Sequence, residues 1–162
     1  MLMPKRTKYR KVFKRFKKNP TKFRNPKTRL SFGSVGLRAT SAGVLSARAI
    51  EATRRSITRT LKRSGQVYTC VFPDKPITRK PSEVRMGRGK GSVDHWAAKV
   101  FPGSVIFEVS GVKEELARKS LKLAAGKLPV KTRFVQESPI AQNMKTSTCL
   151  CRRVQIKKDC MR

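Results

Sequence analysis

The spacing of apolar residues predicts an amphipathic helix over residues 47–64. A step of about 100° per residue gathers aliphatic side chains on one side of this helix and basic side chains on the other. The apolar stripe comprises Ala47, Ile50, Ile57 and Leu61, and the basic face comprises Arg48, Arg55, Arg59, Lys62 and Arg63. Ser46 is a suitable N-cap, and Gly65 is a suitable residue after the last turn. Arg54 falls within the apolar stripe, where the pattern gives it no role beyond snorkelling.

A second helix is predicted over residues 113–127. Glu114 and Glu115 lie in its first turn and Lys127 in its last turn, as the helix dipole favours. The expected buried face comprises Leu116, Ala117, Ser120, Leu123 and Ala124. Pro129 ends the helical pattern.

Shorter segments are rich in β-forming residues. Strands are expected at residues 30–35 (closed by Gly36), at 66–72 (buried), at 93–101, at 104–109 and at 130–135, with 77–81 as an edge strand or connector. Pro102 and Gly103 are expected to fold residues 93–109 into a hairpin. The order of elements indicates an α+β fold, in which two helices pack on one face of an antiparallel or mixed β-sheet. We expect a basic N-terminal arm and linker at residues 1–29, a single domain at 30–137, and a flexible C-terminal extension of unknown role at 138–162.

The charge of the chain indicates a polyanionic partner. Among 162 residues there are 40 Lys or Arg and 9 Asp or Glu, which gives a formal net charge of +31. A membrane surface is the less favoured polyanion, because no apolar run approaches the roughly 18 residues of a spanning helix. We therefore expect a nucleic-acid partner, no membrane association and no homo-oligomer. On the basic face of residues 47–64, plain solvation is the alternative to a bound polyanion. Glu51 is the only acid of this helix, so the five cations of the basic face are expected to be uncompensated and to repel one another unless a polyanion lies alongside.

The N-terminal arm combines basic and aromatic residues, and the chain has no Asp or Glu before Glu51. Tyr9, Phe13 and Phe16 are interleaved with the basic residues, a pattern typical of single-stranded nucleic-acid binding. The predicted nucleic-acid contacts of the arm are Lys5, Arg6, Lys8, Arg10, Lys11, Lys14 and Arg15. A solvated tail and a mitochondrial presequence are the alternatives. Because like charges repel along the arm, we expect it to become ordered only on its partner.

No residues with the spacing of a catalytic, metal or cofactor site are evident. The four cysteines are Cys70, Cys149, Cys151 and Cys160, and they lack the paired CxxC spacing of structural zinc sites. Without a secretory leader, a reducing compartment and free thiols are expected. Asp94 and His95 are adjacent on a predicted strand, so their side chains should point to opposite faces. We expect a protein that is not an enzyme.

Residues 83–91 read Glu-Val-Arg-Met-Gly-Arg-Gly-Lys-Gly and are the strongest candidate for contact with the partner. Glycines permit positive φ angles and a close approach of the backbone. Lys90 is followed by Gly91, whereas a phosphate-binding P-loop requires Ser or Thr there. Ser92 likewise breaks the dinucleotide-binding glycine pattern. A projecting basic loop between two strands is the expectation, and a flexible loop without a dedicated role is the alternative.

Six blocks of residues resemble the bacterial-type large-subunit ribosomal protein L-sixteen family, in the family's order and near its spacing. They are Pro4-Lys5-Arg6-Thr7-Lys8, Ser31-Phe32-Gly33-Ser34, Ala47-Arg48-Ala49-Ile50-Glu51-Ala52, Val71-Phe72-Pro73-Asp74-Lys75-Pro76-Ile77-Thr78, Val84-Arg85-Met86-Gly87-Arg88-Gly89-Lys90-Gly91, and Gly111-Val112-Lys113-Glu114-Glu115-Leu116-Ala117-Arg118. The resemblance covers residues 1–135. The chain departs from the family's usual residues at Tyr68 and Cys70, so one RNA contact in the strand expected at residues 66–72 is expected to be missing.

The resemblance implies an α/β-hammerhead type fold and a seat on large-subunit rRNA, beside the cleft for tRNA and near the peptidyl transferase centre. It also implies neighbouring ribosomal proteins as partners, and a tRNA-proximal loop formed by Arg85, Met86, Gly87, Arg88, Gly89, Lys90 and Gly91. Arg85 matches an arginine that some bacteria hydroxylate. The basic composition and the added tail favour a mitochondrial ribosome, with a bacterial or chloroplast ribosome as alternatives. A free RNA chaperone or DNA-binding protein is the alternative function.

Overall fold

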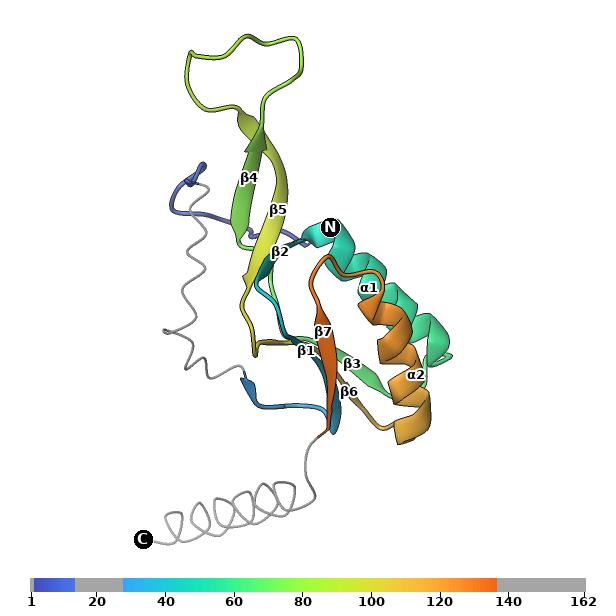
Figure 1. Ribbon diagram of the computed structural model, residues 1–162. Coiled ribbons are helices and arrows are strands. Elements are labelled where there is room, and N and C mark those ends of the chain that lie inside the picture. The colour runs from blue at the N-terminus through green and yellow to red at the C-terminus, as the bar shows by residue number, and fades with distance from the viewer. Residues whose placement is uncertain (1, 14–27, 137–162) are drawn as a thin grey trace, which may run out of the picture.

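The computed structural model describes residues 2–13 and 28–136. Two helices and seven strands lie in this part of the chain (Figure 1). In chain order they are β1 (Val35–Ala39), β2 (Gly43–Ser46), α1 (Ala47–Thr60), β3 (Gln66–Thr69), β4 (Lys75–Arg79), β5 (Ser92–Val100), β6 (Val105–Ser110), α2 (Glu114–Ala125) and β7 (Thr132–Gln136). The predicted α+β fold is confirmed, although most element boundaries differ by a few residues. The strand β2 was not predicted.

The strands form two antiparallel sheets, and the expectation of a single sheet is wrong. The larger sheet has the order β3-β6-β1-β7 and the smaller sheet the order β2-β5-β4. The predicted hairpin over residues 93–109 is also wrong, because β5 and β6 belong to different sheets. At the turn between them Gly103 has a φ of 88° and donates its N–H to the carbonyl of Ala39 at 2.8 Å. This contact with β1 directs the chain from the smaller sheet into the larger one.

Both helices cover the same face of the larger sheet, and the main core lies between them and the strands (Figure 1). The predicted apolar stripe of α1 is fully buried there. The predicted face of α2 is partly wrong, since Leu116 and Leu123 are exposed and Leu121 is buried. The residues of α2 that pack inward are Ala117, Ser120, Leu121 and Ala124.

The ends of α1 follow from local chemistry. Ser46 caps the helix as predicted, because its hydroxyl accepts the N–H of Ala49 at 3.2 Å. The helix stops at Thr60, before the predicted end at residue 64. Lys62 and Arg63 adopt positive φ angles of 50° and 64°, which no α-helix tolerates. The chain then turns at Gly65, where an added Cβ would lie 2.4 Å from the carbonyl oxygen of Ser110.

The segment before β1 wraps around a buried carboxylate. Glu108 of β6 is 1% exposed, and its Oε2 accepts the N–H groups of Phe32 at 2.6 Å and Gly33 at 2.8 Å. The N–H of Ser31 lies 3.1 Å from the same oxygen. These bonds replace strand pairing, so β1 begins at Val35 instead of residue 30. Gly36 lies inside the strand and does not end it.

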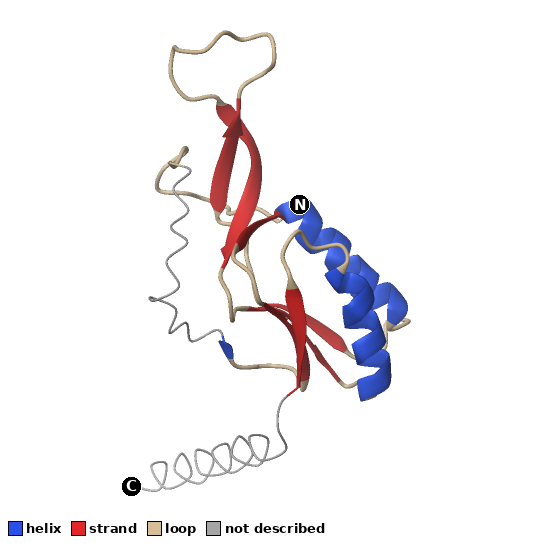
Figure 2. Cartoon of the chain, viewed as in Figure 1, coloured by secondary structure: helices blue, strands red, loops and turns tan. Residues whose placement is uncertain are grey.

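The positions of β3 and β4 at the edges of the sheets explain the remaining differences between the predicted and the observed strands. The strand β3 lies at the edge of the larger sheet and is half-buried, so the expected buried strand over residues 66–72 is wrong. Tyr68 of β3 stacks on Phe32 with ring centroids 5.3 Å apart. The strand β4 lies at the edge of the smaller sheet, as predicted, but it begins at Lys75 within the expected turn. Figure 2 shows the long loop that follows it.

Candidate nucleic-acid interface

The loop between β4 and β5 projects beyond both sheets (Figures 1 and 2). All side chains from residues 81–90 are exposed, and Met86 is 94% exposed. Gly87 and Gly89 have φ angles of 104° and 87°, which confirms the expected positive φ at these two glycines. Gly91 is required for a different reason, because an added Cβ would lie 2.7 Å from the carbonyl oxygen of Arg79. The predicted projecting loop is therefore confirmed, while its ligand stays a prediction.

The N-terminal arm is attached to this loop through Lys90. Lys11 donates from Nζ to the carbonyl oxygen of Lys90 at 2.7 Å, and Lys90 donates from Nζ to the carbonyl of Val12. The Lys90 ammonium also lies 5.4 Å from the ring centroid of Phe13. The arm, blue in Figure 1, crosses the smaller sheet below the loop, and Leu2 packs against the core. The expectation that the arm orders only on its partner is thus wrong for residues 2–13, because these contacts offset its self-repulsion.

We expect Lys11→Met to loosen the base of the loop. Removing the ammonium frees the carbonyl of Lys90, so local opening should become more frequent. Glu83 is exposed within the loop, and its cleavage by a glutamate-specific protease should become several-fold faster. Lys8→Met is the matched control, because Lys8 contacts the ring of its neighbour Tyr9 and has no bond to the loop among the described residues. Equal cleavage in both variants would show that the arm does not hold the loop.

A basic surface covers the C-terminal half of α1. One hollow is lined by Arg54, Arg55, Thr58, Arg59, Lys62 and Arg63, and we call these five cations the α1 cation cluster. Four of them were predicted as nucleic-acid contacts, and Arg54 was missed. Within residues 28–136, no acidic side chain lies within ion-pair distance of Arg59, Lys62 or Arg63. The helix dipole also favours cations at this end of α1.

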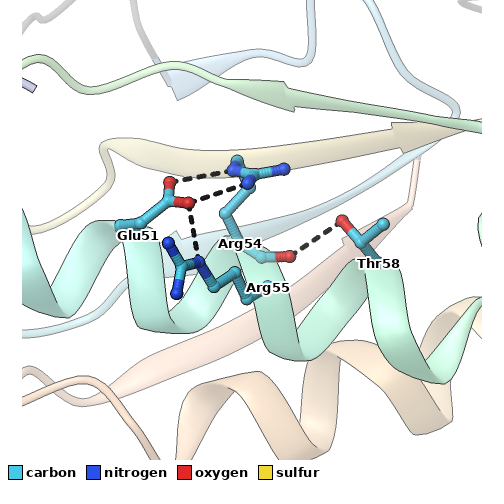
Figure 3. A network of polar contacts seen from close by, with 4 residues as sticks. All are labelled: Glu51, Arg54, Arg55 and Thr58. Atoms are coloured by element: carbon cyan, nitrogen blue, oxygen red, sulfur yellow. Dashed lines mark hydrogen bonds and ion pairs between the residues drawn. The ribbon is translucent and has the colours of Figure 1, made fainter. Parts of the chain in front are cut away.

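Glu51 organises the start of the α1 cation cluster (Figure 3). Arg54 donates to the two carboxylate oxygens at 2.9 and 2.8 Å, and Arg55 donates at 3.0 Å. The hydrogen bond from Arg54, opposed by burial and aided by Arg55, lowers the pKa of Glu51 to about 2. Arg54 therefore has a defined role, which the Glu three residues earlier could have indicated. The expectation that every cation on this face is uncompensated is wrong for Arg55.

A second hollow gathers predicted contacts from the arm and from α1. Arg10, Lys11 and Arg48 line it together with Trp96 and the pair Asp94–His95. His95 Nδ1 lies 2.8 Å from Asp94 Oδ2, so the expectation that these side chains point apart is wrong. This hydrogen bond lowers the pKa of Asp94. Both side chains are substantially exposed, at 48% for Asp94 and 35% for His95, and no nucleophile was predicted near them.

The other arm residues predicted as contacts are dispersed. Lys5, Arg6 and Lys8 are exposed, and Lys14 and Arg15 lie outside the described residues. The same is true of the cysteines in the C-terminal extension. Residues 2–13 and 28–136 contain no group of three or more His, Cys, Asp or Glu side chains that could hold a metal ion. No helix in that part of the chain is long and apolar enough to cross a membrane.

Comparisons with known proteins match nearly the whole described chain. A family model described as "Ribosomal protein L16p/L10e" matches residues 4–135. The "Large ribosomal subunit protein uL16" of Sinorhizobium medicae is 58% identical over 136 residues, which cover 84% of this chain and 97% of that protein. The proteins of the same name from Bartonella bacilliformis and Rhizobium etli (strain CIAT 652) are 56% and 57% identical over equal shares.

Proposed function

This chain belongs to the ribosomal protein L16p/L10e family, and we propose that its projecting loop helps to position aminoacyl-tRNA near the peptidyl transferase centre. The chain is a structural constituent of the large ribosomal subunit, associated with its rRNA and proteins, and it is not an enzyme. Family membership at this level of identity sets aside a free RNA chaperone or DNA-binding protein. We further infer that the chain is present as a single copy bound to rRNA.

We assign rRNA contact to the α1 cation cluster and to the basic residues of the arm. Support comes from the absence of acidic partners for Arg59, Lys62 and Arg63 among the described residues, together with the net charge of +31. We keep the proposed division into arm, domain and extension, with one change. Residues 2–13 are attached to the domain, so the arm presents its cations from a defined position beside the loop.

The exposure of residues 81–90 carries the proposal for tRNA. A tRNA is too large to enter the packed domain, so the side chains that contact it must lie on the surface, and Arg85 and Arg88 both lie in this exposed stretch. Open space surrounds Gly87 and Gly89, where an added Cβ would meet nothing within 4 Å. Lys80, which directly precedes the loop, donates from Nζ to the carbonyl of Gly87 at 2.5 Å, and this hydrogen bond stabilises the loop conformation.

Replacing Arg85 by alanine is expected to slow accommodation of aminoacyl-tRNA without weakening attachment of the chain to the large subunit. Arg85 is exposed and makes no ion pair within the described residues, so the fold should be unaffected. Loss of one phosphate contact should slow accommodation by up to about tenfold. The measurement is the rate of dipeptide formation on purified subunits, with retention checked by sedimentation. Arg85→Lys is the control that keeps the charge. Equal loss of attachment and rate would contradict the assigned role.

We also propose that the ribosome is mitochondrial. The relatives named above come from alphaproteobacteria, the group from which mitochondria descend, and this chain carries a basic extension beyond the family match at residue 135. Detection of the chain in ribosomes from purified mitochondria would support this proposal. Detection only in ribosomes outside the organelle would overturn it.

A further inference from the structure

The hollow beside Trp96 forms where the smaller sheet is incomplete. The strand β2 pairs only with residues 97–100 of β5, because the chain leaves the sheet at Ser46 and enters α1. Among the described residues, no strand pairs with residues 92–96 of β5 on that side. The arm and the first turn of α1 lie there instead, and with β5 they line a hollow of about 690 Å³. This volume lies within the range of about 300–1,000 Å³ for sites that bind small molecules.

A β-bulge in β5 brings Asp94 and His95 together in this hollow. In the pairing with β4, His95 lies opposite Ile77. Val93 lies opposite Thr78, which leaves Asp94 as an extra residue in β5. Such a bulge redirects side chains that would otherwise alternate between the two faces of the sheet. His95 Nδ1 consequently lies 2.8 Å from Asp94 Oδ2, and both residues line the hollow. The bulge therefore provides a carboxylate that is held in a defined position.

The carboxylate of Asp94 can accept further hydrogen bonds. The hydrogen bond from His95, opposed by desolvation and aided by Arg79 and Arg48, lowers the pKa of Asp94. The group is therefore ionised near neutral pH and can only accept hydrogen bonds. A carboxylate has about four lone-pair positions on its two oxygens, and His95 uses one of them. Since the Asp94 side chain is 48% exposed, a ligand in the hollow can reach the others.

The other walls of the hollow fit a nucleotide. Trp96 and Leu2 provide apolar surface against which a flat base can lie. Arg10 of the arm and Arg48 of α1 are exposed and line the same hollow, so two elements offer a guanidinium to phosphate. A carboxylate among these cations would weaken a site for phosphate alone. Asp94 therefore indicates a ligand that carries hydrogen-bond donors as well as phosphate.

The hydrogen-bonding pattern of Asp94 distinguishes among the RNA bases. Guanine has two adjacent donors on its Watson–Crick edge, namely N1–H and the N2 amino group, whereas each of the other three bases has a single donor group there. A carboxylate with two acceptor oxygens matches this pair, just as it matches the two parallel N–H groups of an arginine. An arginine of a neighbouring protein would also suit Asp94, but Arg10 and Arg48 would repel it.

We propose that this hollow binds one unpaired guanosine of RNA, with Asp94 on the N1 and N2 groups of the base, Trp96 against its face, and Arg10 and Arg48 on its phosphates. The proposal rests on the proposed rRNA-binding function and adds a base preference at one position. Because Arg10 belongs to the arm, the site is complete only while the arm stays attached to the domain. A bound guanosine would in turn stabilise that attachment.

The emission of Trp96 provides a direct readout, because the chain contains a single tryptophan. The test titrates the full-length protein with short single-stranded RNAs that differ only in a central guanosine, inosine or adenosine among uridines. Inosine keeps N1–H and lacks the N2 amino group. We expect the guanosine RNA to quench Trp96 and to bind at least about tenfold more tightly than the adenosine RNA, with the inosine RNA between them.

Two variants separate recognition of the base from recognition of phosphate. Asp94→Asn should reduce the guanosine preference to within about twofold without weakening binding of the adenosine RNA, because its amide has one acceptor oxygen instead of two. Arg48→Gln should weaken binding of all three RNAs equally and lower the salt slope by about 0.7 units. Glu115→Gln, at an exposed position on α2, makes the same change in charge as Asp94→Asn and should keep the preference. Melting temperatures establish that each variant is folded.

The outcomes separate this site from RNA binding in general. If the RNAs bind, as followed by fluorescence anisotropy of a labelled strand, but leave the emission of Trp96 unchanged, the site is wrong while RNA binding stands. If Trp96 is quenched equally by all three RNAs, or if Asp94→Asn keeps the guanosine preference, recognition of guanine by Asp94 is overturned. Failure of the wild type to bind any of the RNAs would instead count against the proposed function.

Discussion

Replacing Glu108 by alanine is expected to lower the free energy of unfolding by about 3–5 kcal/mol. The carboxylate is 1% exposed and accepts the backbone N–H groups of Ser31, Phe32 and Gly33. Alanine would leave these donors without their acceptor, and each unsatisfied buried donor costs about 1–3 kcal/mol. The total free energy of unfolding of a domain of this size is about 5–15 kcal/mol, so the variant should be close to unfolding. Urea denaturation near neutral pH measures the change.

Two further variants separate charge from hydrogen bonding. Glu108→Gln keeps one acceptor oxygen but points an NH₂ group at backbone donors, so we expect a smaller loss of about 1–3 kcal/mol. Glu115→Ala removes the same charge from an exposed position and should change stability by less than about 0.5 kcal/mol. A loss for Glu115→Ala comparable to that for Glu108→Ala would show that net charge, and not the buried acceptor, controls stability.

Ionisation of the Glu108 carboxyl group should also make stability depend on pH. Burial alone would raise the pKa of Glu108, but the N–H groups of Gly33, Phe32 and Ser31 outweigh it and lower the pKa below its ordinary value of 4.5. The ionised group therefore stabilises the fold fully above the unfolded pKa, and this contribution is lost as pH falls from about 4.5 through the folded pKa. The difference in unfolding free energy between wild type and Glu108→Gln should shrink across that window.

Local signals in the sequence predicted the parts of the fold that depend on neighbours along the chain. Ser46 as the N-cap, the buried stripe of α1 and the positive φ at Gly87 and Gly89 all follow from residues within a few positions. The inward face of α2 was mispredicted because leucines lie on several sides of that helix. Packing selects the spacing of Ala117, Ser120, Leu121 and Ala124, which follows the i, i+3, i+4, i+7 pattern.

Contacts between distant residues could not be read from the sequence. Glu108 bonds to residues 75 to 77 positions away, although a lone acid within the apolar run 105–109 was a signal that such a partner exists. The attachment of Lys11 to Lys90 spans 79 positions. The division into two sheets depends on how Gly103 meets Ala39.

Neutralising four residues of the α1 cation cluster is expected to cause the largest loss of rRNA binding. The variant carries Arg55→Gln, Arg59→Gln, Lys62→Gln and Arg63→Gln, and it keeps Arg54, which retains its bonds to Glu51. If each cation neutralises one phosphate, the salt slope should fall by about three units, and affinity at physiological salt by about 10²–10³-fold. These side chains are exposed and Arg55 is 75% exposed, so the fold should tolerate the changes.

The α2 helix offers a control with the same change in net charge. The control variant lacks four exposed cations that lie within α2 or next to its ends, through the changes Lys113→Gln, Lys119→Gln, Lys122→Gln and Lys127→Gln. If binding depends on the position of the cations, this control should keep most of the affinity and most of the salt slope. If it depends only on the net charge of +31, both quadruple variants should lose equally. Equal losses would remove the α1 cation cluster as an rRNA site, whereas a large loss confined to the α1 variant places the rRNA backbone along the C-terminal half of α1.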